Sequence, residues 1–442
     1  MQISLSGSVS APGDKSISHR ALILGALAEG TTKITGLLEG DDILHTANAM
    51  RSFGVRVTRQ GAVEGAGAGA WQVEGCGARG FSAPDAPINF GNAGTGARLI
   101  LGAAAGFNLD VSYCGDESLS SRPMSRVLTP LREMGAIFMA RGDKLPLSQK
   151  PSAVPEGKNA LSPISFTPPH ASAQVKSCIL LAGLQACGTT IVHEKRLTRD
   201  HTENMLEAFG VQVNRETIGS GQKVSINGPA HLCSTTINVP GDPSSAAFLI
   251  AGALIVPGSD ITVKNVMMNP TRTGLFNVLT QMGAYLRADN VRRSGGETIA
   301  DFHVKHSNLF GVIVPPERAA SMIDEYPILA VISAFAKGKT VMKGLDELRV
   351  KESDRLFGTY QLLTDNGVDA QIDGDDLIVR GGIVAGGGVV KTHHDHRIAM
   401  SALILGLGAQ QKISIDDESM IATSFPNFFD LMASLGANIE RL

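Results

Sequence analysis

The sequence is poor in cysteine and contains no long apolar run. Its five cysteines are odd in number, widely spaced and free of any C-x-x-C pair, which argues against a disulfide framework and a zinc site and fits reduced thiols in a cytosol. No apolar run approaches the roughly 18 residues that a membrane helix needs. The first residues, MQISLSGSVS, lack the basic and apolar regions of a secretory signal. We expect a cytoplasmic protein that does not interact with a membrane.

Neither sign of charge is in large excess. Thirty-nine basic residues against 42 acidic residues give a formal net charge of −3, which offers no overall attraction for nucleic acid. Any site for an anion must therefore be local. Aromatic residues are scarce at 5%, against 43% apolar residues and 50 glycines, so small aliphatic side chains and many turns are expected. At 442 residues the chain exceeds a single core, and two domains are predicted.

One short pattern recurs six times: an amphipathic stretch, an apolar residue, a glycine and an alternation typical of a strand, as in MRSFGVRV and LEAFGVQV. The six glycines are Gly54, Gly135, Gly210, Gly283, Gly367 and Gly436. Their spacing of about 70 to 85 residues indicates a structural repeat. Each glycine stands where the end of a helix needs a left-handed residue, so each repeat is predicted to contain a helix followed by a strand.

A second helix, apolar on nearly every side, precedes the amphipathic one in each repeat. The six stretches are RALILGALAEG, ARLILGAAAG, VKSCILLAGLQAC, SSAAFLIAGAL, YPILAVISAFAKG and RIAMSALILGL. Because such helices cannot face water, we expect an α/β fold in which sheets surround buried central helices, with three repeats in each of two domains. The predicted domains are residues 1–17 together with 236–442, and residues 18–235, with the second crossing of the chain within 227–242.

The segment PGDKSISHR at 12–20 resembles a phosphate-binding loop in its glycine, lysine and serine residues. A nucleotide loop needs a glycine directly before its lysine, so that consecutive N–H groups wrap the phosphate, whereas here Asp14 stands in that place. The plainer alternative is an ordinary helix start capped by Ser16 or Ser18. The segment alone does not separate a phosphate site from a helix start.

Cationic residues gather where the predicted helices begin. They are Lys15, Arg20, Arg98, Lys176 and Arg397 at the buried helices, and Arg122, Arg126, Arg199, Arg272, Arg349, Lys351 and Arg355 at the amphipathic ones. The N-terminus of a helix already offers N–H groups and partial positive charge, so an added arginine makes an anion site. The alternative for any one of them is a surface ion pair. Because stacked repeats bring equivalent loops to one end of a domain, we expect a shared site for a polyanion.

Two acids lie among these cations, Asp324 in SMIDEYP and Glu352 in VKESDR. One interpretation is that each neutralises a neighbouring base. The functional alternative is a pair of carboxylates that serve as base and acid in a partly dry site. The segment HHDH at 393–396 suggests a metal, but no other segment offers convincing partners and an arginine follows directly. We predict no metal.

Ten segments, taken together and in this order, resemble the 3-phosphoshikimate 1-carboxyvinyltransferase family, also called the 5-enolpyruvylshikimate-3-phosphate (EPSP) synthases. They are PGDKSISHRA, GNAGTGAR, SSRPMSR, ASAQVKS, TRDHTE, PGDPSSAA, IDEYP, LRVKESDRL, DHRIAM and TSFPNF. The resemblance runs from about residue 5 to 440. The resemblance implies a two-domain inside-out α/β barrel with the active site in the cleft between the domains. It also implies transfer of the enolpyruvyl group of phosphoenolpyruvate to the 5-hydroxyl of shikimate 3-phosphate, through a tetrahedral intermediate and with release of phosphate, in chorismate and aromatic amino acid biosynthesis.

The resemblance assigns roles to the residues at matching positions. Shikimate 3-phosphate would be bound by Lys15, Ser16, Arg20, Ser172, Gln174, Arg199, Asp324 and Lys351. Phosphoenolpyruvate would be bound by Lys15, Gly94, Arg122, Gln174, Arg355 and Arg397. Asp324 would take the proton of the 5-hydroxyl, and Glu352, helped by Lys15, would protonate the methylene carbon and later reclaim a proton. No cofactor is implied, since phosphoenolpyruvate carries its own leaving group, and we expect a monomer whose partners are these two small molecules.

Two positions depart from the pattern of many relatives. Ala173 stands where many have a second serine, which removes one hydrogen bond to substrate, and Thr423 stands where others have a lysine. With Lys176 and Arg199, the chain resembles the second, more divergent branch of the family. That branch includes members that tolerate glyphosate, a mimic of phosphoenolpyruvate, and tolerance is linked to alanine at the position of Gly94. We expect a glyphosate-sensitive enzyme.

Two other functions stay open on the sequence. The related UDP-N-acetylglucosamine carboxyvinyltransferase moves the same group onto a UDP-aminosugar, but it uses a cysteine on a mobile loop, and the corresponding DESLSSRPMSR has none. Cys114 lies just upstream, without the expected arginine spacing. The other alternative is a protein that binds phosphorylated metabolites without turnover, and the acids Asp324 and Glu352 argue against it.

Overall fold

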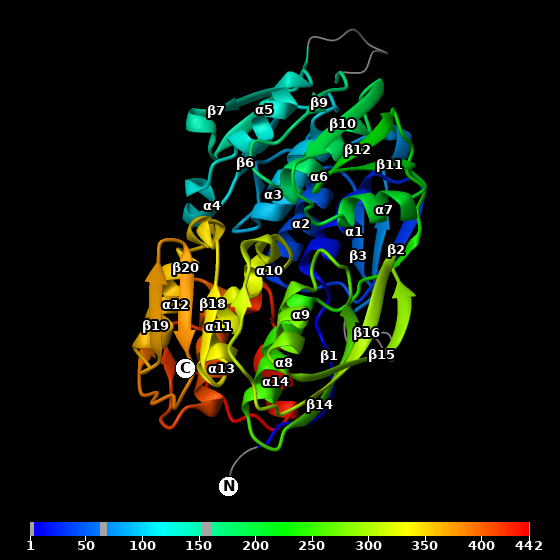
Figure 1. The fold of residues 1–442 in the computed structure, drawn as a ribbon. Coiled ribbons are helices and arrows are strands. Elements are labelled where there is room, and N and C mark those ends of the chain that lie inside the picture. The colour runs from blue at the N-terminus through cyan, green and yellow to red at the C-terminus, as the bar shows by residue number, and fades with distance from the viewer. Residues whose placement is uncertain (1–3, 62–68, 153–160, 442) are drawn as a thin grey trace. The chain divides into compact units, whose positions relative to one another are not determined.

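The computed structural model describes residues 4–61, 69–152 and 161–441. The described chain forms two compact units (Figure 1). Unit 1 contains residues 1–12, 240–293 and 297–442, and unit 2 contains residues 13–239 and 294–296. The chain thus passes between the units after Pro12 and after Val239, a few residues from the boundaries placed on the sequence. Each unit has its own apolar core.

Unit 2 has three four-stranded sheets, ordered β13-β2-β4-β3, β5-β6-β8-β7 and β9-β10-β12-β11. The first is formed by β2 (Thr31–Thr35), β3 (Arg56–Arg59), β4 (Trp71–Glu74) and β13 (Thr236–Asn238). The second is formed by β5 (Ile88–Asn89), β6 (Val111–Cys114), β7 (Ile137–Ala140) and β8 (Leu147–Lys150). The third is formed by β9 (Ser165–Phe166), β10 (Gly188–Glu194), β11 (Val213–Ile218) and β12 (Gly221–Gly228).

Three helices fill the centre of unit 2: α1 (Lys15–Leu27), α3 (Gly94–Ala104) and α6 (Ala173–Gly183). They are buried along most of their length and pack on one another, as their all-round apolar sequences predict. Each repeat also has an amphipathic helix: α2 (Asp41–Ser52), α5 (Ser125–Glu133) and α7 (His201–Ala208). A short helix, α4 (Glu117–Ser121), precedes α5.

Unit 1 repeats this plan. Its sheets are ordered β1-β14-β16-β15, β17-β18-β20-β19 and β21-β22. Their strands are β1 (Ser6–Ser10), β14 (Asp260–Met267), β15 (Tyr285–Ser294), β16 (Glu297–Lys305), β17 (Ile313–Val314), β18 (Lys339–Met342), β19 (Asp369–Asp373), β20 (Asp376–Arg380), β21 (Val389–Val390) and β22 (Ser414–Ile415). The buried helices are α8 (Pro243–Ile255), α11 (Tyr326–Ala334) and α13 (His396–Gly408), which pack on one another. The amphipathic helices are α9 (Gly274–Gln281), α12 (Arg355–Thr364) and α14 (Phe428–Ser434).

The two units exchange their first strands. In four of the six repeats, the strand before the buried helix pairs in parallel with the strand after it: β5 with β6, β9 with β10, β17 with β18, and β21 with β22. The first repeat of each unit breaks this rule. Strand β1 precedes α1 of unit 2 but pairs with β14 of unit 1, whereas β13 precedes α8 of unit 1 but pairs with β2 of unit 2 (Figure 1).

The repeat glycines adopt the backbone conformation predicted for them. All six have positive φ, between 78° for Gly367 and 105° for Gly135. Each follows the last turn of its amphipathic helix and lets the chain reverse into the next segment. The predicted α/β fold with central helices and outer sheets is confirmed. By hydrogen bonding the sheets stay separate, so no closed barrel forms among the described residues.

Within residues 4–61, 69–152 and 161–441, no helix is both long enough and apolar enough to cross a bilayer.

Candidate functional site

The segment 12–20 is the start of α1, but its cap is not the residue that we expected. Asp14 is the N-cap, because its Oδ1 accepts a hydrogen bond of 2.8 Å from the backbone N–H of Ile17. The expectation that Ser16 or Ser18 caps this helix is therefore wrong. Ser18 is buried, and its hydroxyl accepts from the N–H of Leu38 at 3.0 Å instead. The acidic residue that disqualifies a nucleotide loop is the one that begins the helix.

Lys15 and Arg20 leave α1 in different environments. The ammonium of Lys15 pairs with Asp42 at 2.9 Å, in the first turn of α2. Arg20 is buried, and its guanidinium donates to Ser16 O at 2.8 Å, Thr202 Oγ1 at 2.7 Å and Ser177 Oγ at 2.9 Å. Arg20 thereby joins α1 to α6 and α7 through two hydroxyl groups.

Two arginines converge on Gly94, the first residue of α3. A Cβ added to Gly94 would lie 3.1 Å from Arg98 Nη1 and 3.3 Å from Arg122 Nη1. Arg122 Nη2 donates to Asn92 Oδ1 at 2.8 Å and to Ser118 Oγ at 3.1 Å. The N-terminus of α3 adds its own partial positive charge. A glycine flanked by two guanidinium groups at a helix start can hold a small anion against the backbone.

Ser172 and Gln174 stand at the beginning of α6. Ser172 is the N-cap, and its hydroxyl accepts from the N–H of Val175 at 3.4 Å. The amide of Gln174 is oriented by two bonds, since its Oε1 accepts from Arg98 at 3.0 Å and its Nε2 donates to Thr95 Oγ1 at 2.9 Å. Gln174 and Gly94 are therefore parts of one polar cluster in unit 2.

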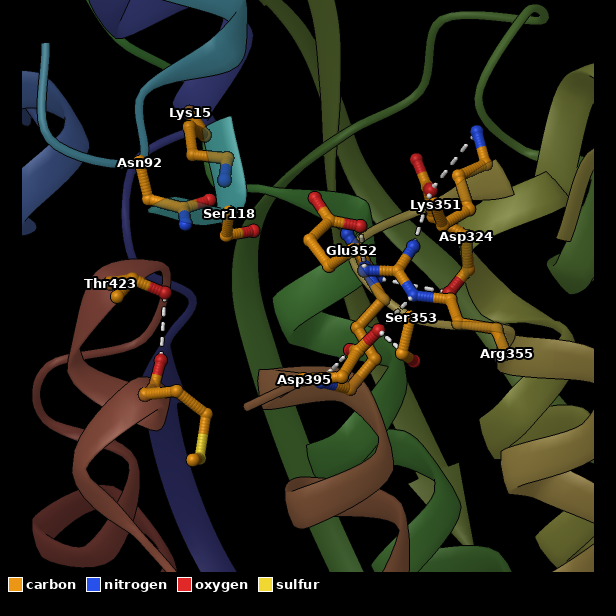
Figure 2. A network of polar contacts seen from close by, with 12 residues as sticks. Lys15, Asn92, Ser118, Asp324, Lys351, Glu352, Ser353, Arg355, Asp395 and Thr423 are labelled. Atoms are coloured by element: carbon orange, nitrogen blue, oxygen red, sulfur yellow. Dashed lines mark hydrogen bonds and ion pairs between the residues drawn. The ribbon is translucent and has the colours of Figure 1, made fainter. Parts of the chain in front are cut away.

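In unit 1, the predicted residues surround one guanidinium. Arg355, the first residue of α12, is 1% exposed. Its Nη1 lies 3.0 Å from Asp324 Oδ1, its Nη2 lies 2.6 Å from Glu352 Oε2, and its Nε lies 2.8 Å from Asp395 Oδ2 (Figure 2). Burial alone would lower the pKa of Arg355, but the three carboxylates outweigh it and raise the pKa further above its usual value. The arginine stays charged and fixes the positions of both candidate acids.

Lys351 and Arg397 complete this cluster around Asp324. Lys351 Nζ lies 3.8 Å from Asp324 Oδ1. Arg397 Nη1 donates to the backbone oxygen of Asp324 at 3.1 Å and lies 3.5 Å from Glu325 Oε1. Unit 1 thus brings together five of the predicted site residues: Asp324, Lys351, Glu352, Arg355 and Arg397.

Known proteins that are similar to the whole chain identify its family. The family model of EPSP synthase (3-phosphoshikimate 1-carboxyvinyltransferase) matches residues 2–432. The chain belongs to the EPSP synthase family. It is 53% identical to the 3-phosphoshikimate 1-carboxyvinyltransferase of Rhizobium johnstonii, over 99% of this chain and 95% of the relative. It is 55% identical to that of Rhodopseudomonas palustris, over 98% of this chain and 96% of the relative.

A solved structure of an EPSP synthase from Acinetobacter baumannii is also similar. It superposes with a TM-score of 0.88 at 43% identity, over 100% of this chain and 98% of that chain. The family, the fold and the activity expected from the sequence are confirmed. EPSP synthases transfer the enolpyruvyl group of phosphoenolpyruvate to shikimate 3-phosphate in aromatic biosynthesis. The relatives named here are 3-phosphoshikimate enzymes, which favours this function over transfer to a UDP-aminosugar.

Three further cations at helix starts pair with carboxylates of their own unit. Lys176 is fully buried and pairs with two glutamates of its own unit. Arg272 is buried against Asp242, the N-cap of α8, at 2.9 Å. Arg349 forms a partly exposed pair with Asp375 at 3.0 Å. For these three cations the structure shows an ion pair, the alternative that the sequence left open for any single cation, although Lys176 and Arg272 are buried.

Asp395 also belongs to the cluster around Arg355, and the sequence analysis did not place it there. It is the N-cap of α13, where its Oδ1 accepts from the N–H of Arg397 at 2.9 Å while its Oδ2 binds Arg355. Burial by itself raises the pKa of Asp395, but the Arg355 guanidinium outweighs burial and the pKa is lowered. An aspartate two residues before a site arginine, at a helix start, was the available signal. Neighbouring His394 is exposed and points to Asp417, 3.6 Å away.

Proposed function

We propose that residues of both units carry the enolpyruvyl transfer. Shikimate 3-phosphate is held by Lys15, Ser16, Arg20, Ser172, Gln174, Arg199, Asp324 and Lys351, and phosphoenolpyruvate by Lys15, Gly94, Arg122, Gln174, Arg355 and Arg397. Two phosphates and two carboxylates bring about six negative charges, which need many cations to offset their repulsion and desolvation. The two arginines at Gly94 and the cations around Asp324 support this assignment.

The proposed reaction begins with an addition. Asp324 accepts the proton of the 5-hydroxyl as that oxygen bonds to C2 of phosphoenolpyruvate, and Glu352, assisted by Lys15, donates a proton to the C3 methylene carbon. In the second step Glu352 takes a proton back from that carbon and the C2–O bond to phosphate breaks with its electron pair. The departing phosphate takes up the proton held by Asp324, so both acids return to their starting states. Separate acids let one site run addition and elimination in turn.

The contact that carries this proposal is the bridge formed by Arg355. One guanidinium holds Asp324 at 3.0 Å and Glu352 at 2.6 Å, each through a different nitrogen. Two carboxylates this close would repel each other, and the shared cation offsets that repulsion. The geometry therefore keeps two ionisable acids at a fixed separation, as a two-step proton transfer requires.

Phosphate release with both substrates tests the proposal. Asp324→Asn and Glu352→Gln should each lower kcat by about 100-fold or more, because each removes one proton carrier. Asp375→Asn is the matched control, since it neutralises an exposed carboxylate that pairs with Arg349 in the same unit. A kcat close to wild type in either variant contradicts the assigned roles. Absence of phosphate release by the wild type would indicate a binding protein.

Two finer expectations concern the state and location of the enzyme. We propose a monomer, and light scattering coupled to size-exclusion chromatography would show a dimer if this is wrong. We also propose action in the cytoplasm. The five cysteines are all free thiols, and Cys76 and Cys178 are buried, which suits a reducing compartment.

A further inference from the structure

Unit 2 contains a buried ionic cluster that the reaction described above does not use. We call it the lysine cluster: Lys176, Glu194, Thr198 and Glu203. The Lys176 ammonium lies 2.9 Å from Glu194 Oε2 and 2.7 Å from Glu203 Oε1, and the side chains of Lys176 and Glu203 are 0% exposed. The Thr198 hydroxyl donates to the other oxygen of Glu194. Three structural elements meet at one ammonium group.

Stability alone does not explain why this site holds a buried ionic cluster. Removing charges from water is costly, and apolar residues of similar volume often stabilise a core as well or better. Burial alone would lower the pKa of Lys176, but Glu203 and Glu194 outweigh it and the pKa is raised, so the lysine remains charged. The ion pairs and hydrogen bonds of the lysine cluster are directional, unlike the contacts of an apolar core, so they can fix the position of a backbone segment.

The backbone that the cluster fixes is the segment 195–200. Glu194 is the last residue of β10 and Glu203 lies in the first turn of α7, so the same ammonium binds both ends of the connection between them. Thr198 ties the middle of the segment to Glu194. Arg199, the next residue, is half-buried and belongs to the set proposed for shikimate 3-phosphate.

A second contact between α6 and α7 lies next to the lysine cluster. Thr202 and Ser177, the neighbours of Glu203 and Lys176, bond to each other at 2.7 Å and both accept from Arg20. Lys176 pairs with the carboxylates Glu194 and Glu203, and Arg20 binds the adjacent hydroxyl groups of Ser177 and Thr202. The start of α7 is held both by the lysine cluster and by a proposed substrate ligand.

We propose that Lys176 is a positioning residue: its buried ammonium clamps the segment 195–200 between β10 and α7 and so holds Arg199 where it binds the phosphate of shikimate 3-phosphate. This inference rests on the proposed role of Arg199. Lys176 itself touches neither substrate. Loss of the clamp frees the segment, so Arg199 must be ordered again each time the substrate binds.

Steady-state kinetics of Lys176→Met test this role. The KM for shikimate 3-phosphate should rise about tenfold, the size of a typical coupling between neighbouring groups, while kcat and the KM for phosphoenolpyruvate stay within about twofold. Lys223→Met is the matched control, because Lys223 forms an exposed pair with Glu216 in the same unit, and it should change nothing. Equal changes in all three constants would overturn the proposal, since general loosening of the fold has that effect.

A double-mutant cycle with Arg199→Ala separates this inference from the function on which it rests. If Lys176 acts through Arg199, Lys176→Met should have no further effect on the KM for shikimate 3-phosphate once Arg199 is gone. Full additivity overturns the clamp. If Arg199→Ala alone leaves that KM unchanged, the failure lies in the proposed role of Arg199.

A second variant covers the case in which Lys176→Met does not fold. Thr198→Val removes the hydroxyl that binds Glu194 and keeps the shape of the side chain. It leaves every charge of the lysine cluster in place. It should raise the KM for shikimate 3-phosphate several-fold without changing kcat, and an unchanged KM overturns the proposal.

Discussion

At the scale of single residues, Gly94 is where a small change should matter most. A methyl group there would meet two guanidinium nitrogens at 3.1 and 3.3 Å, so both arginines would have to shift by a few tenths of an ångström. Under the proposed role of Gly94, the space lost is space for phosphoenolpyruvate and for its mimic glyphosate.

We predict that Gly94→Ala raises the glyphosate concentration for half-inhibition by about tenfold or more, as one added methyl group in a tight pocket commonly does. The KM for phosphoenolpyruvate should rise less. Inhibition curves for the wild type and the variant measure both effects. Gly61→Ala is the control, because no atom of the residues that the structure describes lies within 4 Å of its added Cβ. A wild type that already resists glyphosate contradicts the expectation of a sensitive enzyme.

His19 gives the fold a pH dependence. It is fully buried, its Nδ1 bonds to Thr46 Oγ1 at 2.8 Å, and burial lowers its pKa from 6.5 to about 3. Above pH 6.5 the ring is neutral in both the folded and unfolded chains and contributes nothing. Between pH 6.5 and pH 3, His19 is protonated in the unfolded chain but stays neutral in the folded chain. The free energy of unfolding therefore falls by about 1.4 kcal/mol for each pH unit in this range.

We predict that His19→Gln loses less thermal stability than the wild type between pH 7 and pH 5. The midpoint of thermal unfolding at the two pH values measures this loss. His394→Gln, which changes an exposed histidine, should keep the slope of the wild type. Identical slopes for wild type and His19→Gln would show that another group controls the acid response.

The residue-scale chemistry was only partly predictable. Motifs located the cluster around Arg355 because they record which residue types occur together. They could not show that Lys176 and Arg272 turn inward, since their carboxylate partners come from other elements. Asp395 was missed for a related reason: its pairing with Arg355 links positions 40 residues apart, and no local pattern encodes that contact.

At the scale of elements, the ends of the amphipathic helices depend on backbone conformation. Gly210 has φ of +88°, and its nearest neighbour for an added Cβ is Cys233 Sγ at 4.0 Å. Space is therefore available, and the left-handed backbone alone penalises a side chain. Gly358 lies inside α12, and its added Cβ would make an ordinary contact of 3.5 Å with Ile398 Cδ1.

We predict that Gly210→Ala lowers the free energy of unfolding by about 1 to 2 kcal/mol, the cost of a left-handed alanine. Gly358→Ala should be neutral or stabilising by up to about 1 kcal/mol, because alanine favours a helix. Chemical denaturation of both variants measures the difference. Equal stabilities of the two variants would contradict the view that positive φ requires glycine at the repeat positions.

Most of the element plan could be read from the sequence because its signals are local. A helix apolar on all sides, a glycine after an amphipathic helix and an alternating strand each lie within about a dozen residues. The exchange of β1 and β13 could not be read. Strand β13 has three residues, too few for a pattern, and β1 pairs with a strand more than 200 residues away.

At the scale of the whole molecule, the exchange makes the two units unequal. Residues 13–239 contain every strand of the three sheets of unit 2, including β13. Residues 240–442 lack β1, which forms the edge of the first sheet of unit 1. Residues 13–239 therefore contain a complete core, whereas residues 240–442 alone would have an open sheet edge.

We predict that a fragment of residues 13–239 folds and unfolds cooperatively, whereas residues 240–442 alone are less stable and aggregate more readily. Circular dichroism and denaturation of the two fragments measure this. Adding a peptide of residues 1–12 should stabilise the second fragment and leave the first unchanged. A fragment 240–442 that is as stable without the peptide contradicts the importance of β1.

During synthesis on the ribosome, β1 is made long before the strand with which it pairs. Its residues emerge well before those of β14, since the hydrogen bond from Leu5 to Ser259 spans 254 residues. At about 5 to 20 residues per second, the strand waits roughly 13 to 50 s for its partner. Its sequence, SGSVS, buries only Val9 in the finished sheet. A serine-rich strand can wait in water without attracting other nascent chains, which a more apolar one would do.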